Sequence, residues 1–405
     1  MSGICGIFSY KGTPVDANLL ERMNNIMAHR GPDDCGIFVS PGIGLGHRRL
    51  SVIDLDSGKQ PMGNEDGSIQ VAFDGAIYNF RELRKSLEEK GHRFRTRSDT
   101  ESLLHAYEEW GESFAEKLRG MFAIALWDSR EQKLMLIRDR LGKKPLYYSR
   151  TKNRLLFASE LKAFLADPAI PREIDPSALD AYMSFGYIPA PLSIFKSIRK
   201  LPPAHCAVCT RQGFAIREYW RLPMDEEAPP RKEEDLLDQL RSIFDEAVKI
   251  RMAGDVPLGA FLSGGIDSSL VVAAMSGLQA PEPVKTTAIG FDDKRFNELE
   301  FARAMAAHCK TDHTEFVVDP NAVSVLEDIV WHLDEPFADS SAIPTYYVSK
   351  MARQKVTVVL SGDGGDEVFA GYIKRYSMNR VEDRIRKILP ERLRCWAGSI
   401  SRMYP

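Results

Sequence analysis

Two short stretches of small, hydroxyl and acidic residues carry side chains that could bind a nucleotide phosphate. Residues 263–269 read SGGIDSS and residues 361–367 read SGDGGDE. Glycines have no Cβ and let the backbone approach a ligand closely. Free N–H groups at a helix start, with serine hydroxyls beside them, form an anion cradle. The first stretch therefore predicts a pyrophosphate-binding loop, although a simple tight turn is the alternative.

The flanking residues indicate how these stretches are positioned. Apolar runs at 258–262 and 356–360 predict buried parallel strands, and residues 268–275 predict a helix start. Open α/β sheets bind ligands at the carboxyl ends of such strands. Carboxylates at that edge suit Mg²⁺ that bridges nucleotide phosphates, although a solvated acidic turn is the alternative. The first loop lacks the lysine of a Walker A motif.

The first loop resembles that of the ATP pyrophosphatases, which release pyrophosphate and leave AMP on the substrate. The ordered pair resembles the synthetase domain of the asparagine synthetase family. The resemblance implies ATP and Mg²⁺ as cofactors, with Mg²⁺ and phosphate held by Asp267, Asp363 and Asp366, and acyl-AMP formation involving Asp363. It implies ATP contacts from Leu262, Ser263, Gly264, Gly265, Asp267, Ser268, Ser269, Ile289, Ser361 and Gly362.

Composition and charge narrow the class of protein. The chain has 405 residues, enough for two or three domains, and its 54 basic and 57 acidic residues give a net charge of −3. This balance indicates neither nucleic acid nor a membrane surface as partner. No export signal or membrane-length apolar run is recognisable, and six scattered cysteines indicate reduced thiols. We therefore expect a cytoplasmic protein. The lone pair Cys206 and Cys209 predicts a strand rather than a zinc site.

The first 165 residues alternate short apolar β-like runs with helical segments, which predicts a sheet sandwich flanked by helices. Seven landmarks in this order resemble the class II glutamine amidotransferase domain: residues 6–8, 29–33, 47–51, 75–79, 98–101, 120–123 and 138–142. The resemblance implies an N-terminal-nucleophile αββα sandwich followed by a doubly wound parallel-sheet ATP-pyrophosphatase domain. We expect domains at 1–222, including an interdomain segment, and at 223–405.

The amidotransferase family needs a nucleophile, an oxyanion hole and groups that hold glutamine. By resemblance, the nucleophile is a cysteine after the initiator methionine, with its α-amine as base, and this position holds Ser2. An asparagine and a glycine N–H stabilise the oxyanion, and these positions hold Asp74 and Gly75. The substrate glutamine would be contacted by Arg49, Asp99 and Ala76, the last replacing a glutamate.

These departures predict a weak glutaminase. A hydroxyl is a weaker nucleophile than a thiolate, and Asp74 would face the oxyanion with like charge. Loss of one oxyanion donor costs roughly 10²–10³ in rate. Cys5 is an alternative nucleophile only after removal of four residues. We expect poor glutamine binding and very slow hydrolysis.

Three later features complete the pattern. Apolar residues at helical spacing in 236–248 predict a helix with a buried face. Residues 333–345 resemble the family's acceptor-side loop. Lys374 and Arg375 could contact phosphate or end a helix. After a helical region at 381–389 the chain stops, whereas family synthetase domains continue to a lysine that stabilises charge, so we expect a truncated or degraded member.

The sequence as a whole predicts an ATP-dependent amide-forming ligase. It would activate aspartate or a related acid and then transfer nitrogen, nominally from glutamine but more readily from ammonia or another amine. Two alternatives are a β-lactam-synthetase-like enzyme with an idle glutaminase half and a non-catalytic scaffold that binds ATP. The acceptor, the amine and the oligomeric state stay open, a homodimer among the alternatives.

Overall fold

The computed structural model describes residues 1–224, 231–291, 298–318 and 322–373, together with residues 376, 377, 380, 384, 387 and 388. The chain divides into two compact units. One comprises Met1–Leu258 and Val318–Val358, and the other comprises Gly259–Val317 and Val359–Pro405. The domain boundary after residue 222 stays a prediction.

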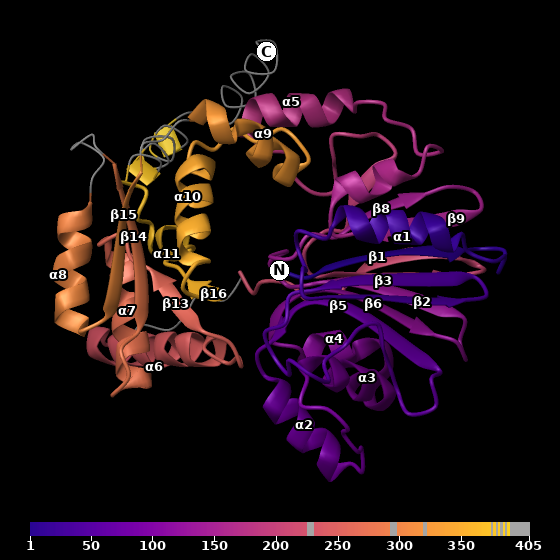
Figure 1. The fold of residues 1–405 in the computed structure, drawn as a ribbon, viewed down its shortest axis with the longest axis horizontal. Helices are drawn as coiled ribbons and strands as arrows, with labels where there is room; N and C mark the ends of the chain where they lie inside the picture. Colours follow the sequence, from indigo (N-terminus) through magenta and orange to yellow (C-terminus); the bar gives the residue numbers. More distant parts are fainter. Residues whose placement is uncertain are drawn as a thin grey trace. The chain divides into compact units, whose positions relative to one another are not determined.

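The N-terminal part of the first unit is a sandwich of two antiparallel sheets between layers of helices (Figure 1). One sheet has the order β10-β8-β9-β1-β3-β2, and the other has the order β12-β11-β7-β6-β5-β4. The strands of the first are β10 (Ile198–Lys200), β8 (Tyr147–Arg150), β9 (Arg154–Ala158), β1 (Gly3–Ser9), β3 (Ile43–Arg49) and β2 (Asp34–Ser40). Those of the second are β12 (Gly213–Glu218), β11 (His205–Thr210), β7 (Lys133–Arg138), β6 (Gly120–Asp128), β5 (Ile69–Ile77) and β4 (Met62–Gly63).

Helices cover the outer faces of both sheets. The helix α1 (Ala17–Ile26) packs on β1 and β3, whereas α2 (Phe80–Glu89), α3 (Asp99–Trp110) and α4 (Phe114–Lys117) lie beyond β5 and β6 (Figure 1). The predicted αββα layering is therefore confirmed. Two further segments, η2 (Leu161–Ala166) and α5 (Pro176–Phe185), lie between β9 and β10 in the chain.

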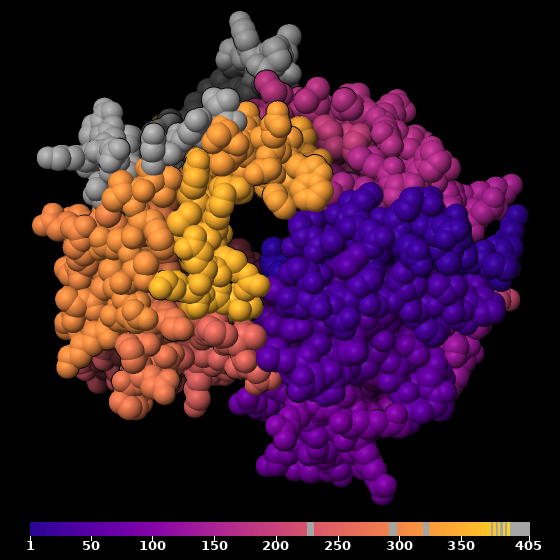
Figure 2. Space-filling model, in the orientation of Figure 1, coloured from indigo at the N-terminus to yellow at the C-terminus, as the bar shows by residue number. Residues whose placement is uncertain are grey.

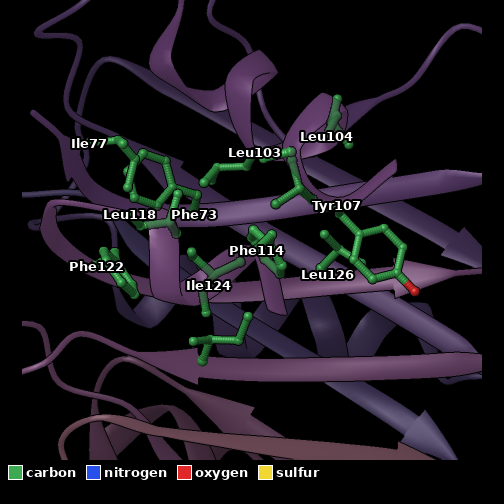
Figure 3. Packing of buried hydrophobic residues seen from close by; sticks show 14 of the residues in the cluster. Phe73, Ile77, Leu103, Leu104, Tyr107, Phe114, Leu118, Phe122, Ile124 and Leu126 are labelled. Atoms are coloured by element: carbon green, nitrogen blue, oxygen red, sulfur yellow. The ribbon is translucent and has the colours of Figure 1, made fainter. Parts of the chain in front are cut away.

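The alternation of side chains along β6 explains the layering. Phe122, Ile124 and Leu126 join the cluster under α3, whereas Ala123, Ala125 and Trp127 join the cluster between the sheets. Successive strand residues point to opposite faces, so a fully apolar strand must be covered on both sides. Figure 3 shows the first cluster, with residues of β5 and β6 against those of α3 and α4.

The second unit is built on a sheet of order β15-β14-β13-β16. Its strands are β13 (Leu258–Phe261), β14 (Lys285–Phe291), β15 (Asp312–Val318) and β16 (Val358–Leu360), and β13 runs parallel to β14. In chain order this sheet reads 3-2-1-4, so the direction of winding reverses between β13 and β16. Such a switch point is where doubly wound sheets bind ligands, and the predicted fold class is confirmed.

The helices of the second half follow the strands. They are α7 (Ile266–Gln279) after β13, α8 (Leu299–Cys309) after β14, α9 (Ala322–Leu333) after β15, α10 (Ala342–Ala352) before β16 and α11 (Gly365–Phe369) after it. None of the helices in the described ranges is long and apolar enough to cross a bilayer. The predicted helix at 381–389 lies largely outside the described residues.

One packing expectation is wrong. The helix α6 (Glu233–Arg251) forms as predicted, but Leu236, Leu237, Leu240 and Ile243 are 40–53% exposed, and Val248 alone is buried. Helical spacing identifies an apolar face but not the element that covers it.

The cysteine pair behaves as predicted. Cys206 and Cys209 are buried in β11, which pairs with β7 and β12. Burial raises the pKa of both thiols. The pair is therefore part of the sheet.

We expect Phe114→Ala to destabilise the first unit by about 3–5 kcal/mol, because a fully buried aromatic leaves a cavity. Phe185→Ala is the matched control, since that ring is 65% exposed. Thermal melts should show a large drop for the first variant and almost none for the second. Equal shifts would contradict the assigned core.

Candidate active site

The loop between β13 and α7 is held in one shape by its own residues. Gly264 has φ +84°, and a Cβ there would lie 2.5 Å from the Cβ of Phe301, so only glycine fits. The hydroxyls of Ser263 and Ser268 are 3.0 Å apart, and the N–H of Gly265 donates to Ser263 Oγ at 3.2 Å. These hydroxyls therefore fix the loop and leave the backbone to face a ligand.

The first turn of α7 has the electrostatics of an anion site. Its N-cap residue is Gly265, which offers no side chain to its orphan N–H groups. These groups carry the positive end of the helix dipole. Ser269 lies in this turn and its N–H donates to the carbonyl of Gly265 at 3.0 Å. A phosphate at this position would accept hydrogen bonds from the remaining free N–H groups of this turn.

The second loop packs directly against the first. A Cβ at Gly365 would lie 2.4 Å from Asp267 Oδ2, and one at Gly362 would lie 2.7 Å from the backbone nitrogen of Ser268. A side chain at Gly362 or Gly365 would clash with the first loop, so the contact between the two loops requires glycine at both positions. Two stretches almost one hundred residues apart meet at the switch point, as the sequence predicts.

The remaining predicted residues surround this meeting point less tightly. Asp363 is exposed and accepts a hydrogen bond from Ser361 Oγ at 2.9 Å. Asp366 packs against Gly371, where a Cβ would lie 1.7 Å from Oδ1. Leu262 is buried and Ile289 is half-buried on β14.

The three aspartates do not form a compact ligand group. Among the described residues, the group of three metal-ligating side chains with mutually close atoms lies elsewhere, and Asp267, Asp363 and Asp366 are not in it. Magnesium commonly takes one or two carboxylates and completes its shell with water and phosphate oxygens. The donor types fit that pattern. Lys374 and Arg375 lie outside the described residues.

In the sandwich, the predicted oxyanion position is occupied by a buried ion pair. Asp74 Oδ2 accepts from Arg30 Nη2 at 2.9 Å, and Lys144 Nζ lies 3.6 Å from Oδ1. Burial would raise the pKa of Asp74, but Lys144, Arg30 and the α-amino group of Met1 outweigh it and hold the pKa below its usual value. Asp74 is thus an ionised acceptor with no proton to donate.

This pair belongs to a longer chain of charges, which we call the charged network: Lys144, Asp74, Arg30, Glu160, Lys162 and Asp334. Arg30 Nη1 lies 3.2 Å from Glu160 Oε1, Lys162 Nζ lies 2.6 Å from Glu160 Oε2, and Lys162 also lies 2.8 Å from Asp334 Oδ1. All six side chains are at most 9% exposed. The network therefore joins the oxyanion position to the acceptor-side loop.

Ser2 sits beside this network. Its carbonyl accepts from Arg30 Nε at 2.7 Å, and its Oγ accepts from the backbone N–H of Leu50 at 3.2 Å. Burial lowers the pKa of the neighbouring Met1 α-amino group to about 5. Cys5, by contrast, is fully buried in β1, and burial raises its thiol pKa. Cys5 is therefore no activated nucleophile.

The glutamine-contact positions differ in their availability. Arg49 already donates to the backbone carbonyls of Leu55 and Ile53, at 3.1 and 3.2 Å. Asp99, at the start of α3, accepts from the N–H of Ile77 at 3.0 Å. Burial raises the pKa of Asp99 to about 6. A buried carboxylate of this kind would favour a cationic ligand.

The two residues after Asp74 have different roles in the strand. Gly75 has φ +154°, and a Cβ there would lie 2.0 Å from the carbonyl oxygen of Met121, so glycine is required. Ala76 is partly buried and offers no polar atom to a substrate.

Comparison with known proteins gives these sites a family. Residues 1–220 match the glutamine amidotransferase domain model, and residues 239–403 match the asparagine synthase model. A putative glutamine-hydrolysing asparagine synthetase 2 of Methanocaldococcus jannaschii is 38% identical over 416 residues, which cover 97% of this chain and 79% of that protein. This chain belongs to the asparagine synthetase family. The resemblance inferred from the sequence is confirmed.

Other relatives set the extent of the match. Asparagine synthetase [glutamine-hydrolyzing] 1 of Bacillus subtilis is 40% identical over 379 residues, which cover 92% of this chain. The chain spans 59% of the length of that relative. A solved B. subtilis glutamine phosphoribosylpyrophosphate amidotransferase aligns at 16% identity and a TM-score of 0.40, covering 80% of this chain and 70% of that one, which is too weak for any inference.

Sequence reasoning about this asparagine synthetase family member missed the partners of Asp74. Nothing in the local pattern around Arg30, Lys144, Glu160 or Lys162 indicates that they meet. One signal was available, because a carboxylate in the middle of an apolar strand is almost never buried without a partner. This signal indicates that a cation must lie beside Asp74, but it does not identify the residue that supplies the cation.

We expect Asp74→Asn to lower stability by about 3 kcal/mol or more, because Lys144 and Arg30 would face a neutral amide. Asp66→Asn is the control, since its ion pair with Arg130 is exposed on both sides. Thermal melts at neutral pH should separate the two variants. A stable Asp74→Asn protein would mean that the pair contributes little.

We expect Asp99→Asn to change how stability depends on pH. The pKa of Asp99 is about 6 in the folded chain against a usual 3.8, so its ionisation costs more in the folded state. Wild-type stability should fall as pH rises between these values, and the variant lacks this loss. The variant's melting temperature minus that of the wild type should therefore increase from pH 4 to 7 without ligand. A constant difference would refute the assignment.

Proposed function

We propose that this chain is the nucleotide-binding and amidotransferase part of an ATP-dependent carbon–nitrogen ligase. The observation that supports it most is the packing of Gly362 and Gly365 against Asp267, which joins two phosphate-type loops at a sheet switch point. A non-catalytic scaffold would not be expected to retain both loops packed against each other. The proposal follows the activity in the names of its relatives.

The proposed reaction has two steps. A carboxylate oxygen of aspartate or a related acid attacks the α-phosphorus of ATP, the bond to the β-phosphate breaks, and pyrophosphate leaves. An amine nitrogen then attacks the acyl carbon, AMP leaves, and the nitrogen loses a proton to solvent or a base. The backbone N–H groups of the α7 N-terminus would bind the departing phosphates.

The remaining roles follow from position. We propose that Leu262 and Ile289 line the adenine and ribose end, while Ser263, Gly264, Gly265, Ser268, Ser269, Ser361 and Gly362 shape the phosphate cradle. Asp267 and Asp366 would hold Mg²⁺, and Asp363 would bear on acyl-AMP formation. When bound, Mg²⁺ would neutralise charge on the phosphates.

For the nitrogen source we propose ammonia or another amine rather than glutamine. The charged network supports this, because Arg30 and Lys144 hold Asp74 as an anion where an oxyanion would need a donor. Ser2 and Ala76 add a weaker nucleophile and a lost polar contact. Arg49 would still need to release its carbonyl partners to bind a carboxylate.

A second candidate shares the first step. The same altered glutaminase position supports a β-lactam-synthetase-like reaction, in which an amine of the activated substrate itself attacks the acyl carbon. We place either reaction in the cytoplasm with small-molecule substrates, and a homodimer stays a prediction.

We expect pyrophosphate release from Mg-ATP and aspartate with ammonium chloride, and very little with glutamine. Asp363→Asn should reduce release to background, whereas Asp312→Asn, an exposed aspartate on β15, should not. Equal rates with glutamine would contradict the reading of Asp74. Absence of pyrophosphate with any acid, despite ATP binding, would favour the scaffold.

A further inference from the structure

Two histidines and a glutamate converge where α2 is connected to α3. His92 follows α2, whereas His105 and Glu108 lie one turn apart on α3. The Nδ1 atoms of the two histidines are 3.2 Å apart. Glu108 Oε2 lies 3.0 Å from the Nδ1 of His105 and 3.6 Å from the Nδ1 of His92. Three potential ligand atoms therefore form a small triangle.

The triangle has the dimensions of a metal coordination face. Zinc bonds nitrogen at about 2.0–2.1 Å and oxygen at about 2.0–2.2 Å in tetrahedral sites, which places neighbouring ligand atoms about 3.3–3.4 Å apart. The three observed separations, 3.0, 3.2 and 3.6 Å, lie on both sides of that value. An ion could be bound with side-chain shifts of a few tenths of an ångström.

The far side of each imidazole is turned toward carboxylates. His92 Nε2 lies 3.4 Å from Glu109 Oε2, and His105 Nε2 lies 3.6 Å from Glu65 Oε1 and 3.8 Å from Glu101 Oε1. Metal-binding histidines usually present their second ring N–H to such a group, which fixes the tautomer. Metal binding would require the tautomer that carries the proton on each Nε2, in which both Nδ1 lone pairs face the ion.

The glutamate is oriented in the same way. Glu108 Oε1 accepts from Asn64 Nδ2 at 2.8 Å, which leaves Oε2 toward the histidines. In the absence of a metal ion, a proton can lie in the 3.0 Å contact between His105 Nδ1 and Glu108 Oε2, and a metal ion would take its place.

The position suits an ion that arrives from solvent. The His105 side chain is 2% exposed, whereas those of His92 and Glu108 are 18% and 21% exposed, so one side of the triangle is open. The connection between α2 and α3 lies at the outer edge of the sandwich, in the purple part of Figures 1 and 2. Imidazole donors favour zinc over magnesium or calcium.

We propose that His92, His105 and Glu108 bind a divalent transition metal ion, zinc by preference, which ties the α2–α3 connection to α3. None of these three residues belongs to the phosphate loops or to the charged network. Its fourth position would hold water. Its role would be structural, because none of its ligands belongs to the candidate active site.

The test is zinc binding by untagged protein that has been stripped with chelator and dialysed against micromolar zinc chloride. The wild type should retain one zinc more per chain than His92→Gln and Glu108→Gln. His308→Gln is the matched control, because that histidine is exposed on α8, and it should retain the wild-type content. Zinc bound at other carboxylates would be common to all four proteins and cancel.

Two readouts make the result independent of folding defects. Zinc should raise the melting temperature of the wild type and His308→Gln by several degrees but not that of His92→Gln, and anomalous scattering at the zinc edge should place the ion between the two Nδ1 atoms. Equal zinc content in wild type and His92→Gln would overturn the proposal. An ion found at another position would also overturn the proposal. The short contact between the two Nδ1 atoms would then be explained by a proton shared by the two histidines.

Discussion

The desolvated carboxylate of Asp74 constrains much of the sandwich. Removing an unpaired charge from water costs far more than a domain's net stability, so a buried aspartate must have a cation beside it. Arg30 and Lys144 satisfy that requirement, and Arg30 also pairs with Glu160. Each buried charge of the network thus has an opposite charge beside it. The last step, Asp334, belongs to a segment more than one hundred residues further along the chain.

The two candidate sites depend on different features of the sequence. The phosphate loops rely on backbone N–H groups and on glycines that a Cβ would block, so their pattern is short and recognisable. The proposed glutaminase site would rely on individual side chains that donate, attack or bind. A single exchange at Ser2 or Asp74 would therefore alter its chemistry.

The same difference explains what the sequence could predict. The continuous apolar run of β6 predicts its two-sided burial, and the serines and glycines after β13 predict the phosphate loop, because both depend on local sequence. The partners of Asp74 and the meeting of His92 with His105 depend on tertiary contacts, which local patterns do not encode. The prediction of a buried face on α6 is wrong for a related reason. Helical spacing identifies an amphipathic helix, but burial depends on a neighbouring element.

The pairing of Lys144 with Asp74 also couples two distant positions of the chain. Among the ion pairs of the described residues, Asp74 is the carboxylate that Lys144 contacts. An uncharged residue at position 74 would leave this lysine buried without a counter-charge. The effect of a substitution at one of the two positions therefore depends on which residue occupies the other.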